Sequence, residues 1–374
     1  MAVFDNSGQQ TQQADRFSLK QKEAFVGYAM AAPALLLIFL FLIVPTVLGL
    51  GFAFTNQRLI SPNPTQWVGL RNFENLLSMR TFTIAPETDP ETGAFVRDEE
   101  GNYVYPRLRN FTRNEEEYPE LQGFQELTSW QSGSSRVYIL AKDAVFIRAI
   151  INTATFVIVV VPVQAGLALI LALLVNQQLA GINIFRTIYF MPVVLSLIIV
   201  SFLWRFIYDG ENGMLNSVLG FVSFGAIKPI DWLGQPSTAL PAVIIVSVWQ
   251  GVGFHMVIWL SGLQTIPAVL YEAADVAGAN AWQKFRYVTW GSLRGTAVLI
   301  FVVITIQAWG LFAQIDAMTG GGPLDATQTI VFQAVRRAFD QQDIAGGSAI
   351  SLVLFVIVIT ISLIQQYLTR ERNV

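Results

Sequence analysis

The sequence contains no cysteine, and its only histidine is His255. The lack of cysteine excludes disulfide bonds, thiolate nucleophiles and thiolate metal sites. A single histidine excludes a multi-histidine metal centre and any Ser-His-Asp triad that does not use His255. Charged residues are also scarce, at 13% of the 374 residues, against about a quarter in a soluble domain. The net charge of -3 argues against nucleic acid as a partner, because that role needs a basic surface.

No glycine is followed by lysine anywhere in the chain, so the P-loop pattern GxxxxGK[ST] cannot be matched. If the protein moves a solute uphill, the energy source must therefore lie on another chain. An enzyme embedded in the membrane would need titratable groups that converge at one depth, and the apolar segments offer none. We expect no cofactor, no metal and no catalytic residue in this chain.

Apolar residues, in contrast, make up 53% of the chain and occur in long runs. A transmembrane helix needs about 20 mostly apolar residues, and a membrane β-strand would instead alternate strictly. Six runs meet the first requirement and none shows the second. We predict an all-α integral membrane protein whose six transmembrane helices cover residues 27–54, 147–175, 184–208, 239–262, 294–315 and 346–368.

Lysine and arginine in the short loops predict the orientation of these helices, because cytoplasmic loops carry the excess. With a cytoplasmic N-terminus, nine such residues lie inside and three outside. The nine are Arg16, Lys20, Lys22, Arg186, Lys284, Arg286, Arg294, Arg370 and Arg372, and the three are Lys228, Arg336 and Arg337. Both termini are therefore predicted to be cytoplasmic. The predicted parts are a flexible tail (1–26), the first helix (27–54), an extracytoplasmic insertion (55–146) and a five-helix core (147–374) with a cytoplasmic loop at 263–293.

The extracytoplasmic insertion is acidic in its middle and carries one hairpin signal. Residues 93–106 predict two short strands around Glu-Gly-Asn. Two interpretations stay open: a solvated excursion with no binding role, and a small domain that contacts an extracytoplasmic partner.

The centres of the six runs hold no Asp, Glu or Lys, which proton- or ion-coupled carriers usually need. They hold neutral polar and aromatic residues instead. Amides and aromatic rings suit an uncharged polyhydroxylated solute, but amides also pair helices with one another, and both interpretations stay open. His255 is either a hydrogen-bonded packing residue or a proton relay. The polar and aromatic set is Asn152, Gln164, Ser196, Trp249, Gln250, Trp259, Gln307 and Trp309.

The cytoplasmic loop 263–293 predicts a short helix from Ala268 to Val276. Pro267 can open it, and Gly278 can end it in a left-handed conformation. A second amphipathic stretch follows at 281–288. Such a pair could insert into a cleft of a cytoplasmic partner, or it could lie on the inner leaflet of the membrane.

Within this loop, Tyr271-Glu272-Ala273-Ala274, then Gly278-Ala279, Phe285 and Val288 resemble the EAA loop of binding-protein-dependent ABC permeases. The carbohydrate branch, of the maltose and glycerol-3-phosphate type, is the most similar. Four further stretches resemble that family: TQWVGLRNFENLL (65–77), INTATFVIVVVPVQAGLALILALLVN (151–176), FRTIYFMPVVLS (185–196) and MTGGGPLDATQTIVF (318–332). Val288-Thr289-Trp290-Gly291 departs from the usual Ile-x-Leu-Pro ending, and Ala277 stands where an Asp commonly precedes the glycine.

The resemblance implies a permease subunit in the inner membrane of a bacterial or archaeal cell. Its expected partners are a second, similar permease, two ATPase subunits, an extracytoplasmic solute-binding protein, membrane lipid and a sugar or related polyol. The implied ATPase-docking residues are Glu272, Ala273, Ala274 and Gly278. The implied substrate-pathway residues are Gln250, Gly251, Phe254, Gln307, Ala308 and Leu311.

The outer turn Gly320–Pro323 is either a tight turn that needs glycine or a contact with the solute-binding protein.

An alternative function is a secondary carrier or channel for a neutral polar solute that acts without an ATPase. The absence of membrane carboxylates and the presence of a loop shaped for docking argue against that alternative.

Overall fold

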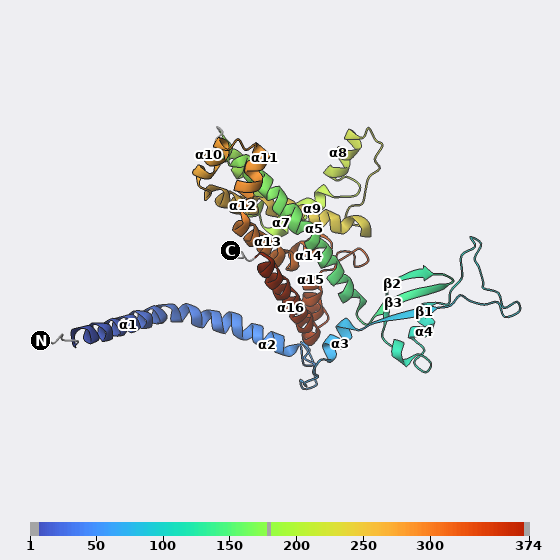
Figure 1. Cartoon of the computed structure of the whole chain (residues 1–374). Helices are drawn as coiled ribbons and strands as arrows, with labels where there is room; N and C mark the ends of the chain where they lie inside the picture. The colour runs from blue at the N-terminus through green and yellow to red at the C-terminus, as the bar shows by residue number, and fades with distance from the viewer. Residues whose placement is uncertain (1–6, 178–180, 370–374) are drawn as a thin grey trace.

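The computed structural model describes residues 7–177 and 181–369, and it is mainly helical (Figure 1). Arg370, Arg372 and the first six residues of the N-terminal tail lie outside the described residues. Within the described residues, four helices are long and apolar enough to cross a membrane, and two bent helix pairs pass the same test together. The prediction of six membrane-crossing segments is therefore confirmed. The four are Gln21–Phe52, Ala144–Val175 (α5), Pro236–Gln264 (α9) and Ile344–Tyr367, which lies within α16 (Ile344–Thr369).

The first span is the end of a helix that starts far upstream. It comprises α1 (Ser7–Ile38), the π-helical turn η1 (Phe39–Ile43) and α2 (Val44–Phe52), and it extends away from the other spans (Figure 1). The structure places helix from Ser7 onward, within the tail that the sequence analysis predicted to be flexible. The physical reason is composition, since Gln, Ala, Lys and Glu are strong helix formers and the tail has no proline.

Two predicted spans are not single straight helices. Residues 184–208 fall on α6 (Ile182–Val194) and α7 (Leu197–Ile207), which are bent by 98°. Leu195 and Ser196 between them are extended, with ψ of 141° and 135°, and Pro192 has no backbone N–H with which to continue the ladder. The segment 294–315 ends early, because α13 (Arg294–Trp309) stops at Gly310 and α14 (Ala313–Met318) follows as a separate helix.

The remaining short helices connect these spans. Before α13, the chain forms α10 (Ala268–Val276), α11 (Ala281–Gln283), η3 (Lys284–Thr289) and α12 (Trp290–Ser292). The pair 281–292 and α13 is bent by 68°. Elsewhere the connecting helices are α8 (Met214–Val222), α15 (Ile330–Val335) and η4 (Arg336–Asp340).

The insertion holds a small sheet that the sequence analysis did not predict. Strands β1 (Met79–Ile84), β2 (Gln125–Ser132) and β3 (Ser135–Ala141) lie in the order β1-β3-β2, all antiparallel. Leu140, Tyr138 and Ile84 pack with Leu121 and Phe124 into a separate core. The helices of the insertion are α3 (Arg71–Leu77), α4 (Leu108–Thr112) and η2 (Pro119–Leu121).

The predicted hairpin at 93–106 is present only as a chain reversal with an isolated β-bridge. Arg97 and Tyr103 form an antiparallel bridge, and the backbone N–H of Asp98 donates to the carbonyl oxygen of Asn102 at 2.9 Å. No named strand forms there within the described residues.

Helix α5 is the centre of the membrane core and packs against α9, α13 and α15. It leads from the insertion towards α10–α12 (Figure 1), so we name its two sides the insertion end and the α10 end. The indole of Trp259 donates to the carbonyl oxygen of Ala165 at 3.0 Å, and the amide of Asn152 donates to the carbonyl oxygens of Asp325 and Gln328. Trp259 therefore joins α9 to α5, and Asn152 joins α5 to the loop that precedes α15.

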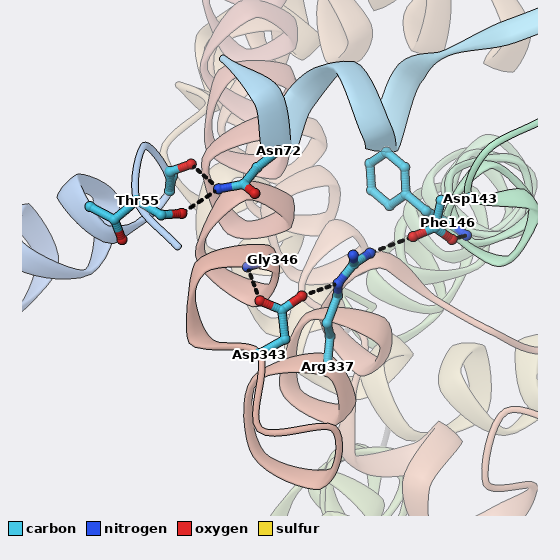
Figure 2. Close-up of polar contacts among 8 residues, drawn as sticks. Thr55, Asn72, Asp143, Phe146, Arg337, Asp343 and Gly346 are labelled. Carbon is cyan, nitrogen blue, oxygen red and sulfur yellow. Dashed lines mark hydrogen bonds and ion pairs between the residues drawn. The ribbon is translucent and has the colours of Figure 1, made fainter. Parts of the chain in front are cut away.

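An ion-pair cluster holds the helix starts together at the insertion end (Figure 2). Arg337 pairs with Asp143, which caps α5. The Arg337 Nε also lies 2.9 Å from a carboxylate oxygen of Asp343. Asp143 accepts from the backbone N–H of Phe146, and Asp343 accepts from that of Gly346, each at 2.9 Å. One guanidinium thus joins the N-termini of α5 and α16. Glycine at position 346 leaves room for this pair, because an added Cβ would lie 2.3 Å from the Arg337 Nε and would displace it.

Substituting Arg337 by methionine is expected to lower the stability of the protein by about 2 kcal/mol. The two carboxylates would lose the cation between them while staying partly buried. Thermal unfolding of the detergent-solubilised chain measures the effect. The matched control is Arg336→Met, since Arg336 is exposed and makes no ion pair among the described residues. Equal melting temperatures for the two variants would contradict the prediction.

Candidate functional site

The spans line an open cavity of about 790 Å³ between α5, α9, α13 and the segment from Gly310 to Gln314. All six residues that the sequence analysis proposed for the substrate pathway line this one cavity. Three come from α9 and three from α13 and its end: Gln250, Gly251, Phe254, Gln307, Ala308 and Leu311. The structure thus brings the six together, and their role towards a solute stays a prediction.

The cavity wall combines amides with apolar and aromatic surface and has no Asp, Glu, Lys or Arg among its described lining residues. Phe254 is 38% exposed and Gln307 is also exposed, whereas Gln250, Ala308 and Leu311 are buried. Phe312 adds a second aromatic ring to the wall. Such a wall can form hydrogen bonds and cover apolar faces, and the buried His255 is the one titratable side chain among its described lining residues.

A chain of amide and hydroxyl groups crosses this wall. The Gln314 amide donates to the Gln250 side-chain oxygen at 3.2 Å, and the Gln250 amide donates to the carbonyl oxygen of Leu195 at 3.4 Å. The Ser247 hydroxyl is hydrogen-bonded to the Gln314 side-chain oxygen. The sequence analysis missed Ser247 and Gln314. The spacing of three residues from Ser247 to Gln250 was an available signal on one helix face, but no signal located Gln314, which follows the break at Gly310.

The polar pair Gln164 and His255 lies beside this chain. The His255 Nδ1 lies 2.9 Å from the Gln164 Nε2 and 2.9 Å from the carbonyl oxygen of Gly251. His255 is 1% exposed, and its Nε2 has no partner among the described residues. No carboxylate lines the cavity near it, so these contacts favour the packing interpretation of His255 over a proton relay. Gln164 lies on α5 and contacts His255 from that helix.

Glycine at position 251 leaves room for the side chain of Gln164. A Cβ added there would lie 2.2 Å from the Gln164 Nε2, which is far inside van der Waals contact. Gly253, on the opposite face of α9, has a different role. A Cβ at Gly253 would lie 2.0 Å from the carbonyl oxygen of Tyr189, so this glycine permits the close approach of α6.

The α10 end presents the loop 263–293 as an ordered pair of helical segments. Helix α10 begins after Pro267, and Gly278 has a φ of +72°, as the sequence predicted. The Tyr271 hydroxyl lies 2.9 Å from the Thr289 hydroxyl, and Lys284 pairs with Asp275 at 2.6 Å. These contacts hold α10 against η3.

The four residues proposed for docking lie together on and after α10. Glu272, Ala273 and Gly278 are exposed, and Ala274 is partly buried. Among the described residues, no ion pair or hydrogen bond involves the Glu272 carboxylate. The loop therefore offers an uncommitted carboxylate beside small residues, which suits contact with another surface.

The outer turn at Gly320–Pro323 meets the steric requirement for glycine. Gly320 and Gly321 have φ of +58° and +84°, and a Cβ at Gly321 would lie 2.7 Å from Gln328 and Phe332. The tight-turn interpretation is therefore sufficient for these glycines. A contact with a solute-binding protein stays a prediction.

Comparison with known proteins gives consistent results over most of the chain. A family described as "Binding-protein-dependent transport system inner membrane component" matches residues 138–374. The trehalose/maltose transport system permease protein of Thermococcus litoralis is 28% identical over 355 residues, which are 95% of this chain and 97% of that protein. A probable starch degradation products transport system permease protein of Thermoanaerobacterium thermosulfurigenes is 30% identical over 258 residues, 67% of this chain and 87% of that protein.

The fold is also similar to a solved structure. A crystal structure of a bacterial ABC transporter involved in the import of the acidic polysaccharide alginate contains a chain with a TM-score of 0.68 and 20% sequence identity. The match covers 96% of this chain and 100% of that chain. The likeness extends over the insertion as well as the spans, so the whole architecture is shared.

Proposed function

The chain belongs to the binding-protein-dependent transport system inner membrane components, and from this premise we propose that it is the permease subunit of an ATP-driven importer for a neutral carbohydrate. It is a multi-pass membrane protein of the ABC transporter permease type. The observation that carries the proposal is the uncharged cavity, where Gln250 and Gln307 face the same space as Phe254. Relatives named for trehalose, maltose and starch degradation products support a sugar.

The choice of a neutral sugar over a phosphorylated polyol rests on electrostatics. A phosphate or carboxylate that leaves water needs a cationic partner, and this cavity has no lysine or arginine among its described lining residues. Hydroxyl groups, in contrast, can exchange hydrogen bonds with Gln250, Gln307 and Gln314. The rings of Phe254 and Phe312 can cover the apolar face of a sugar ring.

The energy for transport would come from two ATPase subunits through α10. In this proposal, Glu272, Ala273, Ala274 and Gly278 seat α10 in a groove of an ATPase subunit at the cytoplasmic face. A second permease completes the pathway, and an extracytoplasmic solute-binding protein delivers the sugar at the insertion end. ATP-driven closure would move α10 and the spans on either side of it, α9 and α13, as a rigid-body change of access. Both termini are cytoplasmic in this arrangement.

A competition assay on the assembled transporter tests the substrate class. Proteoliposomes that contain both permeases, the ATPase subunits and the solute-binding protein would be supplied with labelled neutral mono- and disaccharides. We expect ATP-dependent uptake of at least one, inhibited by excess unlabelled neutral sugar but not by glycerol 3-phosphate or glucuronate. Inhibition by the charged compounds would contradict the neutral-sugar assignment. Uptake by the lone chain without ATPase subunits would contradict the importer assignment.

A further inference from the structure

A second, smaller cavity lies at the insertion end, apart from the proposed sugar pathway. It has a volume of about 290 Å³, and we name it the Arg58 pocket. The loop that follows the first span supplies Asn56 and Arg58, α3 supplies Arg71, Asn72 and Asn75, and Arg337 and Asp343 close the far side. Figure 2 shows Asn72 on one side and the Arg337–Asp343 pair on the other.

The walls of the Arg58 pocket are held in place by backbone and side-chain hydrogen bonds. The N–H of Leu59 donates to the carbonyl oxygen of Gln342, and the N–H of Ala345 donates to that of Gln57, each at 2.9 Å. The Asn72 amide donates to the carbonyl oxygens of Ala53 and Thr55 at 2.7 and 2.8 Å. The loop after the first span is thereby fastened to the start of α16.

The charge of the pocket is unbalanced. Arg337 pairs with Asp143 and Asp343, so these three groups sum to a charge of -1, and Arg58 and Arg71 bring the five groups to +1. Within residues 7–177 and 181–369, neither Arg58 nor Arg71 forms an ion pair or a side-chain hydrogen bond. Asn75 has no side-chain hydrogen bond in the same ranges either. Two unpaired guanidinium groups beside an unpaired amide suit an anionic group with several acceptor oxygens, and phosphate matches the guanidinium fork.

The position of the pocket indicates the source of the anion. Arg58 follows the last residue of the first span, Phe52, by six residues, and Asp343 directly precedes the span that begins at Ile344. The pocket therefore lies at the depth of the lipid headgroups. Large apolar side chains next to the arginines are exposed, as an acyl-chain boundary requires, and one of them is a tryptophan, which is typical of this layer. They are Leu59, Ile60, Trp67 and Leu70.

We propose that the Arg58 pocket binds the headgroup phosphate of an anionic membrane phospholipid. Arg58 and Arg71 would hold the phosphate oxygens, Asn75 would add a hydrogen bond, and the acyl chains would cover the exposed apolar residues. A zwitterionic headgroup would bring its own cation against the two guanidiniums and would bind less well. The proposal does not depend on the solute that the protein transports.

Native mass spectrometry of the full-length chain in mild detergent tests this proposal. The chain would be titrated with phosphatidylglycerol, with phosphatidylcholine and with inorganic phosphate. We expect preferential binding of phosphatidylglycerol, and loss of that preference by about tenfold or more in the variant Arg58→Gln/Arg71→Gln, because both cationic partners of the phosphate would be removed. The Arg58→Lys/Arg71→Lys variant keeps the charge and should retain most of the preference.

The matched control is Arg107→Gln/Arg109→Gln, which removes two exposed arginines of the insertion that lie outside the pocket. Its lipid preference should equal that of the unmodified chain, with the same melting temperature. Equal binding of both lipids, or an unchanged preference in the Arg58→Gln/Arg71→Gln variant, would overturn the proposal. Displacement of the lipid by inorganic phosphate would assign the site to free anions.

Discussion

Substitution of Glu272 by lysine is expected to reduce ATP-dependent uptake to background while the chain still inserts and folds. Glu272 is exposed on α10 and has no partner among the described residues, so reversal of its charge removes no contact within the chain. At a docked interface the same reversal replaces attraction by repulsion. Close interfacial charge pairs are worth about 2–5 kcal/mol, which corresponds to a loss of binding of about 30-fold or more. Uptake and ATPase co-purification, measured on the same preparation, check this expectation.

The control for this prediction is Glu99→Lys, which makes the same charge change on an exposed residue of the insertion. Glu99→Lys should retain uptake and ATPase binding. The isosteric Glu272→Gln variant should be intermediate, because it removes the attraction without adding repulsion. Normal uptake by Glu272→Lys would show that α10 does not dock through this carboxylate.

Features encoded by neighbouring residues could be predicted from the sequence. The six apolar runs predicted the membrane-crossing segments, and Pro267 and Gly278 predicted the ends of α10 and its left-handed exit. In each case the physical cause lies within one helix or one turn. The charges of short loops predicted an orientation in the same way, but the structure contains no membrane that could test it.

Features that depend on distant packing could not be predicted. The 98° bend between α6 and α7 depends on surrounding helices that tolerate two extended residues, and Pro192 alone permits many outcomes. Some 40 residues separate β1 from β2, so no local pattern indicated that β1 pairs with β3. The β2–β3 hairpin turns at Gly133 and Ser134, which is a local signal that the sequence analysis missed.

The cavity illustrates the same limit. A resemblance and an ungapped count placed six residues, and the structure gathers all six around one space. Ser247 could have been found from its spacing to Gln250 on one helix face, but Gln314 joins the set through a contact across 67 residues of sequence, which no periodicity reveals. Gln164 reaches the cavity from α5, and its proximity to Gly251 is visible only in three dimensions.

Substitution of Gly251 by leucine is expected to lower uptake by at least about tenfold while ATPase attachment persists. The added Cβ would lie 2.2 Å from the Gln164 Nε2, which would force Gln164 away from His255. The rest of the side chain would occupy the cavity. Even one methylene in a binding pocket changes discrimination by about 10- to 200-fold, and leucine adds four carbon atoms. The uptake rate of larger sugars should fall more than the uptake rate of smaller sugars.

The matched control is Gly166→Leu, because Gly166 is an exposed glycine of α5 whose added Cβ would meet nothing within 4 Å. A cavity effect requires that Gly166→Leu keep normal uptake and that Gly251→Leu keep a normal melting temperature. If both variants transported equally well, the space between α9 and α13 could not be the route of the solute.

If Gly251→Leu lost stability together with uptake, Gly251→Ala would separate the two effects. Its single carbon disturbs Gln164 but leaves most of the cavity open, so reduced uptake by a stable Gly251→Ala chain would still assign the pathway to this wall.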